Sequence, residues 1–185
     1  MKYYVNLISL ALLFGVLTPA FSGDFRVSSP TFNPDIPLPL VHVFNGFGCE
    51  GGNQSPELHW TSAPAGARSF AVTLYDPDAP TGSGWWHWVV YNIPASVQGL
   101  PLNAGTPDGK HLPEGAVQGV TDFGQRGFGG ACPPAGAGKH RYILTVYALK
   151  VDKLPVPPDA SPAMIGFMIN QNLIDSAVLQ STYGR

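Results

Sequence analysis

The stretch that most constrains the fold is residues 140–149 (HRYILTVYAL), in which almost every position after Arg141 is apolar or aromatic. Its length and its content of β-branched and aromatic residues favour an extended strand over a helix. A strand with apolar side chains on both faces has to be covered on both faces. The run therefore predicts a central strand that is buried on both sides.

Two further runs have the two-residue period of strands. Residues 68–75 (RSFAVTLY) put Phe70, Val72 and Leu74 on one side of the backbone. In residues 87–93 (HWVVYNI), alternation predicts one face with His87, Val89, Tyr91 and Ile93 and the other with Trp88, Val90 and Asn92. Shorter strand candidates lie at residues 39–44, 58–61 and 116–120.

Glycine and proline fill the segments between these runs. The 185 residues include 22 Gly and 19 Pro, and residues 101–115 and 124–138 are too rich in both to be helical. One helix is predicted to close the chain, where Ser161 is a good N-cap, Pro162 suits the first turn, and apolar residues recur at near-helical spacing from Met164 to Val178. The expected fold is mainly β: an antiparallel β-sandwich with a C-terminal helix and few peripheral helices.

Residues 1–22 have the pattern of an export signal. Lys2 supplies a positive charge, residues 7–17 form a short apolar run, and residues 20–22 (AFS) are a small-x-small cleavage site. The apolar run is too short to span a bilayer, although a retained anchor is the alternative. We expect a signal peptide at residues 1–22, a single domain at residues 23–185, and a periplasmic or secreted protein without integral membrane association.

The exported chain would carry little net charge and two cysteines. The formal charge is −2 and becomes more negative when Lys2 is removed, so nothing basic remains to attract nucleic acid. An even number of cysteines in an oxidising compartment normally indicates a disulfide, so Cys49 and Cys132 are expected to pair. The alternative is a Cys132 thiolate activated by His140.

Four chemically active side chains lie where predicted strands meet loops. Asp76 continues one face of the first alternating run, His87 begins the second, and His140 begins the longest run, with Tyr142 on its own face. If these strands are neighbours, the four side chains converge on one pocket at the rim of the sandwich. Two imidazole N–H groups and a phenol O–H would donate to an anion, and Asp76 would fix a histidine tautomer or pair with a ligand ammonium.

Other residues near these positions have roles that are less specific. Residues 127–138 offer backbone N–H groups to an anion. In its Pro-Asp-Ala-Pro turn, Asp78 most simply bonds its own backbone. Structural roles are the expectation for His42, His59 and His111, and positions in the core or the pocket wall for Trp85, Trp86 and Trp88.

At these residues the sequence resembles the phosphatidylethanolamine-binding protein (PEBP) family, in particular its bacterial Raf-kinase-inhibitor-like branch. Residues 76–80 match the family's DPDAP signature, residues 86–94 (WHWVVYNIP) resemble its second element, and residues 133–142 resemble its PP-x-G-x-G-x-HRY element. Residues 47–60 and 118–130 resemble the bacterial branch. The likeness spans nearly all of the chain after residue 22.

The resemblance implies a β-sandwich with a small pocket for phosphate-like anions, including the phosphoethanolamine head group. Carried over by position, the ligand-binding residues are Asp76, Pro80, His87, Pro134, His140 and Tyr142. It also implies a cis bond between Ala79 and Pro80. The family's eukaryotic members commonly have Gly before the two prolines where this chain has Cys132, so the loop geometry there depends on whether Cys132 is bridged.

Three function classes follow from this pattern. The first is a non-enzymatic exported protein that binds a small anionic or phosphorylated ligand without a cofactor. The second, which the resemblance implies, is an inhibitor of a protein partner, such as a protease, that acts through the same rim, with residues 81–84 and 101–115 as the first surfaces to test. The third is a metal-dependent enzyme that uses Asp76, His87 and His140 as ligands, although their wide spacing is not diagnostic of a metal site.

Overall fold

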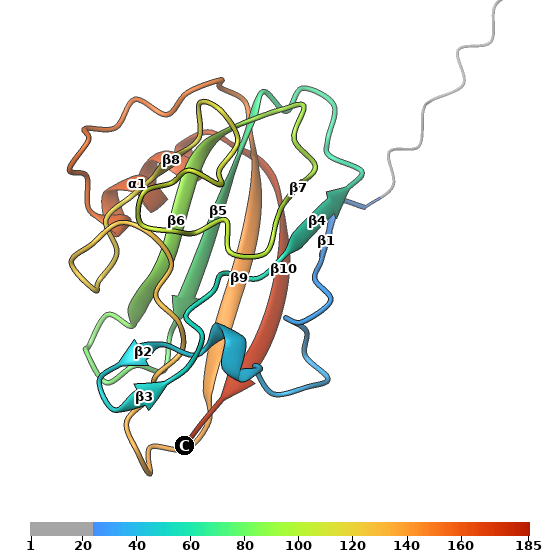
Figure 1. Cartoon of the computed structure of the whole chain (residues 1–185). Helices are drawn as coiled ribbons and strands as arrows, with labels where there is room; N and C mark the ends of the chain where they lie inside the picture. The colour runs from blue at the N-terminus through green and yellow to red at the C-terminus, as the bar shows by residue number, and fades with distance from the viewer. Residues whose placement is uncertain (1–23) are drawn as a thin grey trace, which may run out of the picture.

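The structure is a computed structural model that describes residues 24–185 (Figure 1). The expected signal peptide lies outside the described residues. None of the helices in the described part is long and apolar enough to span a bilayer. The elements are β1 (Arg26–Ser28), η1 (Leu40–His42), β2 (Asn45–Gly46), β3 (Cys49–Glu50), β4 (Leu58–Thr61), β5 (Ser69–Asp76), β6 (Trp85–Pro94), β7 (Gly99–Leu100), β8 (Val117–Gln118), β9 (His140–Leu149), α1 (Pro162–Gln171) and β10 (Leu173–Tyr183).

Antiparallel pairing organises these strands into one large and two small sheets. The large sheet has the order β10-β9-β5-β6-β8, the second sheet is β1-β4-β7, and β2 and β3 form a separate hairpin. The three strongest sequence runs are therefore neighbours, with β5 between β9 and β6. The expected mainly-β, antiparallel fold is confirmed. The expected central strand, β9, is an interior strand next to the central β5.

The main core fills the space between the large sheet and the β1-β4-β7 sheet. Phe70, Val72 and Leu74 of β5 share this buried cluster with Leu144 of β9 and Trp60 of β4. Figure 1 shows β1, β4 and β7 lying in front of one face of the large sheet. Alternation along β5 and β9 thus produces the apolar face that the sequence predicts.

A second, smaller cluster covers the opposite face of the large sheet. Ile165 and Ile169 of α1 pack there with Ala71, Val89 and Leu149. Because the two clusters enclose β5 and β9 from both sides, these strands need apolar residues at nearly every position.

The predicted C-terminal helix is wrong in its second half. Helix α1 begins as expected, with the Ser161 side chain accepting a hydrogen bond from the Met164 backbone N–H, but it ends at Gln171. Residues Leu173–Tyr183 form β10, which pairs with β9 along its whole length. The spacing of apolar residues there fits either structure locally, and pairing with the free edge of β9 determines the outcome.

Two short strand predictions also need correction. Residues 39–44 do not form a strand: Leu40–His42 is a 3-10 turn, closed by a hydrogen bond from the His42 N–H to the Pro39 carbonyl. Residues 116–120 contribute only Val117–Gln118 as β8. By contrast, β4 and β9 have the predicted bounds.

Two irregularities in β6 change which side chains share a face. The pairing with β5 shifts register between Phe70 and Val72 and again between Leu74 and Tyr75. As a result, Ile93 packs with Trp88 and Val90 in the main core rather than with Val89 and Tyr91, which contradicts the expected alternation. The second shift leaves His87 between the paired residues Trp86 and Trp88, as in a β-bulge.

Candidate functional site

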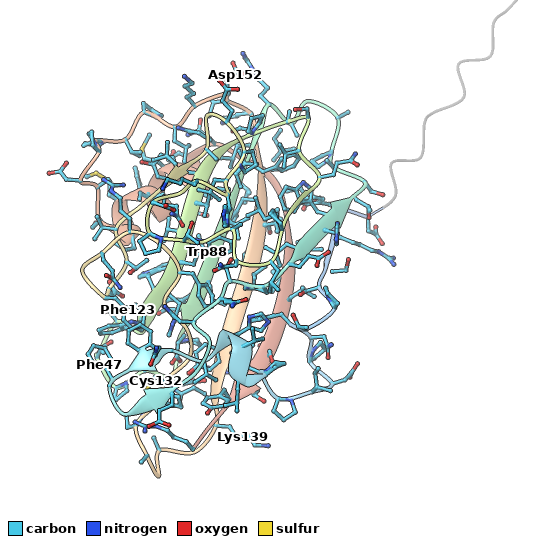
Figure 2. The ribbon with its side chains drawn as sticks, in the orientation of Figure 1. Phe47, Trp88, Phe123, Cys132, Lys139 and Asp152 are labelled. Atoms are coloured by element: carbon cyan, nitrogen blue, oxygen red, sulfur yellow. A yellow bond between two sulfur atoms is a disulfide. The ribbon has the colours of Figure 1, made fainter. Side chains whose placement is uncertain are left out.

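A cavity of about 230 Å³ lies at the end of the sandwich where β5 ends and β6 and β9 begin. It is lined by Phe47, Asp76, Ala79, Pro80, Thr81, Trp85, His87, Phe123, Cys132, Pro133, Pro134, His140 and Tyr142. Figure 2 shows Phe47, Phe123 and Cys132 at this end, beside β2 and β3, with Asp152 at the opposite end. All six residues proposed from the sequence line this one cavity.

Asp76 and His140 form a buried pair in the cavity wall. The Nδ1 atom of His140 lies 2.8 Å from Oδ2 of Asp76, and the other carboxylate oxygen accepts the backbone N–H of Asp78 at 2.8 Å. Both side chains are at least nine-tenths buried. The carboxylate therefore holds the proton of His140 on Nδ1, which leaves Nε2 for the cavity. Of the two roles expected for Asp76, the geometry supports fixing the tautomer.

His87 is anchored in the same way by a different acceptor. Its Nδ1 atom lies 2.7 Å from the carbonyl oxygen of Gly129, and the ring packs edge-on against Tyr142 with 5.2 Å between centroids. Burial lowers the pKa of His87, although the Gly129 bond and the charge of Asp76 oppose that shift. The neutral ring is favoured, with its proton on Nδ1.

The expectation that both imidazoles donate N–H groups to a ligand therefore needs revision. With Nδ1–H used on each ring, a neutral His87 and a neutral His140 each present a lone pair at Nε2. Nε2 becomes a donor only when its ring takes up a second proton. None of the described residues lining the cavity is a lysine or arginine.

Tyr142 supplies a polar group in this wall without a partner. The residue is fully buried, and its hydroxyl oxygen is the only side-chain polar atom in residues 24–185 that is completely shielded from solvent and lacks a hydrogen bond. Burial raises the pKa of Tyr142 well above its ordinary range, and the charge of Asp76 adds to the shift. The hydroxyl is therefore a neutral donor, left unpaired at a cost that a ligand could remove.

The sequence suggested that Asp78 bonds its own backbone. In the structure its side chain instead connects the loop to β9. Its carboxylate accepts the Nε and backbone N–H groups of Arg141 at 2.9 Å each and the Nη2 group at 2.7 Å. The Arg141 side-chain hydrogen bond lowers the pKa of Asp78 to about 2. The self-bonded turn belongs to Asp76, which accepts the Asp78 N–H.

The Ala79–Pro80 bond is trans, so the cis bond implied by the resemblance is wrong for this chain. The trans form is the lower-energy isomer of most X–Pro bonds. Hydrogen bonds from the Thr81 N–H to the Ala79 carbonyl and from the Thr81 hydroxyl to the Gly84 carbonyl hold the turn. Pro80 still lines the cavity.

The predicted disulfide between Cys49 and Cys132 is confirmed. It joins β3 to the segment that carries Pro133 and Pro134, so two walls of the cavity are covalently connected. Cys132 has no free thiol, which removes the alternative of a reactive thiolate. The bridge provides rigidity in the loop where the sequence departs from the eukaryotic pattern.

Three residues that the sequence analysis did not select also build this region. Phe47 and Phe123 stack on each other at 6.1 Å and line the mouth of the cavity. Arg185 donates to the carbonyls of Phe47, Gly48 and Pro133, the same two segments that the disulfide joins. No local sequence pattern marks these residues, because their partners are distant in the chain.

The glycine-rich segment before the prolines is less available to an anion than expected. The N–H groups of Phe128, Gly129 and Ala131 donate to backbone carbonyls, and that of Gly130 donates to the Asn53 side chain. Pro133 and Pro134 have no N–H to offer. The segment serves mainly to position His87, whose backbone carbonyl accepts the Gly129 N–H.

The remaining histidines and tryptophans have structural surroundings. His42 is buried, with both ring nitrogens bonded, and His59 pairs with Glu57 on the surface. Trp88 is a core residue whose indole donates to Gln118, whereas Trp85 lines the cavity. Within residues 24–185, no group of three His, Cys, Asp or Glu side chains is arranged to hold a metal ion.

Comparison with known proteins gives consistent matches over the whole described fold. The family model described as phosphatidylethanolamine-binding protein matches residues 28–184. The UPF0098 protein YbcL of Escherichia coli is 52% identical over 177 residues, which cover 96% of each chain. YbhB of the same organism is 50% identical over 146 residues, covering 79% of this chain and 91% of YbhB.

A solved structure shares the architecture at similar identity. The crystal structure of E. coli YbcL, described as a new member of the mammalian PEBP family, matches with a TM-score of 0.86 and 55% identity over 88% of this chain and 99% of YbcL. The structure of CT736 from Chlamydia trachomatis matches with a TM-score of 0.72 and 29% identity over 87% of this chain and 97% of CT736.

Proposed function

The chain belongs to the phosphatidylethanolamine-binding protein family, and from this premise we propose that it is an exported, non-enzymatic protein whose pocket binds phosphate-like anions, including the phosphoethanolamine head group. The observation that carries the proposal is the buried, unpaired Tyr142 hydroxyl in a cavity that His87 and His140 also line. An oxyanion placed there would accept that hydroxyl and satisfy a group that the protein leaves open.

The size and chemistry of the cavity suit a head group rather than a large ligand. About 230 Å³ accommodates a phosphate with a short substituent. The polar groups gather at Asp76, His87, His140 and Tyr142, while Phe47, Phe123 and the prolines supply an apolar mouth. A polar head with a small apolar or aromatic extension would match this distribution.

The side chains favour binding over nucleophilic catalysis. Cys132 is held in a disulfide, and the Thr81 hydroxyl donates to the Gly84 carbonyl. No hydrogen bond joins either pocket histidine to a hydroxyl side chain among the described residues, and the Nδ1 atoms of the two rings are bonded to Asp76 and Gly129. The same arrangement supports a fixed binding surface.

Export is the second part of the proposal. A disulfide is stable in the periplasm or outside the cell, and residues 1–22 carry the signal pattern. LppC of Mycobacterium tuberculosis, named as a candidate lipoprotein, is 36% identical over 167 residues. Mass spectrometry of the protein from a periplasmic extract should find Gly23 as the first residue; an intact residue 1 in the cytoplasmic fraction would contradict export.

Inhibition of a protein partner is a second candidate, favoured by Phe47. This side chain is 71% exposed at the cavity mouth, stacks on Phe123 and packs at a tilt against Phe44. Exposed aromatic residues next to a pocket are frequent anchors in protein interfaces. Phe47→Ala should abolish inhibition of a target protease; unchanged inhibition would assign any partner contact elsewhere.

Titration calorimetry with inorganic phosphate and phosphoethanolamine tests the binding proposal. We expect wild-type protein to bind both, and His87→Ala and His140→Ala to weaken binding about tenfold or more through the loss of a ligand-facing nitrogen. His59→Ala is the matched control, because His59 pairs with Glu57 on the surface. Thermal unfolding of each variant establishes that it is folded. Binding that neither pocket variant changes would contradict the proposal.

A further inference from the structure

We infer that the pocket selects anions that bring a hydrogen-bond donor of their own, such as a P–OH group or the ammonium of phosphoethanolamine, so that it binds hydrogen phosphate in preference to sulfate. The inference rests on the proposed anion-binding function and specifies its ligand class. It follows from which ring nitrogens of His87 and His140 are already bonded within the protein.

Both imidazoles are fixed with an acceptor side toward the cavity. The Asp76 carboxylate can only accept, so it takes the Nδ1 proton of His140, and the Gly129 carbonyl likewise takes that of His87. Both rings line the cavity, and no hydrogen bond to the described residues engages Nε2 of either one. Two lone pairs therefore face the ligand.

The cavity has few donors to offset these acceptors. Tyr142 contributes one hydroxyl, and the indole N–H of Trp85 is a further donor in the lining. A fully ionised oxyanion such as sulfate has only acceptor oxygens, so oxygens that meet Nε2 would face a lone pair. Hydrogen phosphate has the same tetrahedral shape and, near pH 8, the same charge, but its single P–OH group can donate to one of the two Nε2 atoms, which sulfate cannot do.

Sulfate could bind only if an imidazole first took up a proton. The surroundings of each ring determine the free-energy cost of that protonation. Burial favours neutral His87, and nearby negative charge favours protonation. The titratable or charged groups around His140 are Asp76, Asp78, Arg141, Tyr142 and Tyr183, and those around His87 are Asp76, Asp122 and Tyr142. A protonated His87 would gain an Nε2 donor, so acid pH should raise sulfate binding relative to phosphate binding.

The test compares the two ions on wild-type protein by titration calorimetry. At about pH 8 we expect inorganic phosphate to bind about tenfold or more tightly than sulfate, because an acceptor facing an acceptor in a buried site is costly. The ratio should shrink as the pH is lowered to about 5.5. Equal binding of the two ions at pH 8 would overturn the inference and leave the proposed function standing. Binding of neither ion would overturn both.

Substitution of one histidine tests whether the Nε2 lone pairs, rather than another feature of the pocket, cause the preference for phosphate over sulfate. In His140→Gln, an amide N–H₂ group can take the place of Nε2, so the preference for phosphate at pH 8 should fall several-fold. His87→Gln is the second variant, for the case in which the first does not fold, and His59→Gln is the surface control. A ratio unchanged in a folded pocket variant would overturn the inference.

Discussion

Two environments of buried histidines in this protein differ in how many ring nitrogens form hydrogen bonds within the protein. In the first, His42 of η1 bonds the Gln54 carbonyl through Nδ1 at 2.6 Å and the Thr31 hydroxyl through Nε2 at 2.8 Å. In the second, the pocket, His87 and His140 are also buried but are bonded only through Nδ1. The first environment is complete without a ligand, whereas the second is not.

The difference separates a structural histidine from a binding one more clearly than burial does. Burial alone places His42, His87 and His140 in the same class. The number of ring nitrogens with a hydrogen-bond partner separates His42 from His87 and His140. The unpaired Tyr142 hydroxyl lies in the pocket, with the second group. Leaving such groups open costs stability, so the pocket depends on the surrounding structure to hold its shape.

The largest expected effect comes from removing the disulfide that connects two walls of the pocket. The Cys49–Cys132 bridge closes a sequence separation of 83 residues. Replacing both cysteines with Ala should lower the free energy of unfolding by about 4 to 5 kcal/mol in the chain-entropy model, and should also weaken phosphate binding. Urea unfolding of the variant and of wild type measures the difference. A loss below about 1 kcal/mol would show that Arg185 and packing are sufficient to hold the two segments together without the disulfide.

The second-largest effect tests the environment of His42, in which both ring nitrogens are bonded. His42→Ala leaves the Gln54 carbonyl and the Thr31 hydroxyl without their partner and creates a cavity, so we expect a loss of about 2 to 4 kcal/mol of unfolding free energy. Phosphate affinity should stay within about twofold of wild type when both proteins are folded. A large loss of affinity with little loss of stability would reverse the roles assigned to the two environments.

Much of the fold could be predicted from the sequence because its strongest signals are local. Alternation and turn residues place β4 and β9 within their observed bounds and β5 within one residue. The failures share a cause. Residues 173–183 have apolar spacing that suits a helix, and only the free edge of β9, distant in sequence, makes them a strand. The bulge at His87 likewise depends on pairing with β5.

For the site, residue identity was predictable and hydrogen-bond direction was not. Loop–strand junctions and the family resemblance identify six residues that line the cavity. The sequence contains no sign that Gly129 would take the Nδ1 proton of His87, or that Arg141 rather than the local backbone would hold Asp78. These contacts join segments that are tens of residues apart, and they determine which atoms face a ligand.

A smaller effect appears in the pH dependence of stability. Burial lowers the pKa of His42 and of His87 in the folded state. The unfolded chain therefore binds more protons below about pH 6.5, so the free energy of unfolding should fall as the pH drops, by at most about 1.4 kcal/mol per pH unit for each histidine. His87→Gln should reduce this slope without abolishing it. An identical slope between pH 6.5 and 5 would exclude His87 as a source.

The most direct test of the central claim, that the pocket keeps polar groups unpaired for a ligand, is the substitution Tyr142→Phe, measured for stability and for phosphate binding together. Removing a buried hydroxyl that has no partner should raise the free energy of unfolding of the ligand-free protein by about 1 kcal/mol. Phosphate binding should weaken about tenfold, because the same hydroxyl is a hydrogen-bond donor to the ligand.

Tyr147→Phe is the matched control, since the Tyr147 hydroxyl lies 3.3 Å from that of Thr73 and should lose stability, not binding, when it is removed. The account predicts that stability rises and affinity falls in Tyr142→Phe. A variant that is less stable than wild type, with unchanged phosphate affinity, would contradict it.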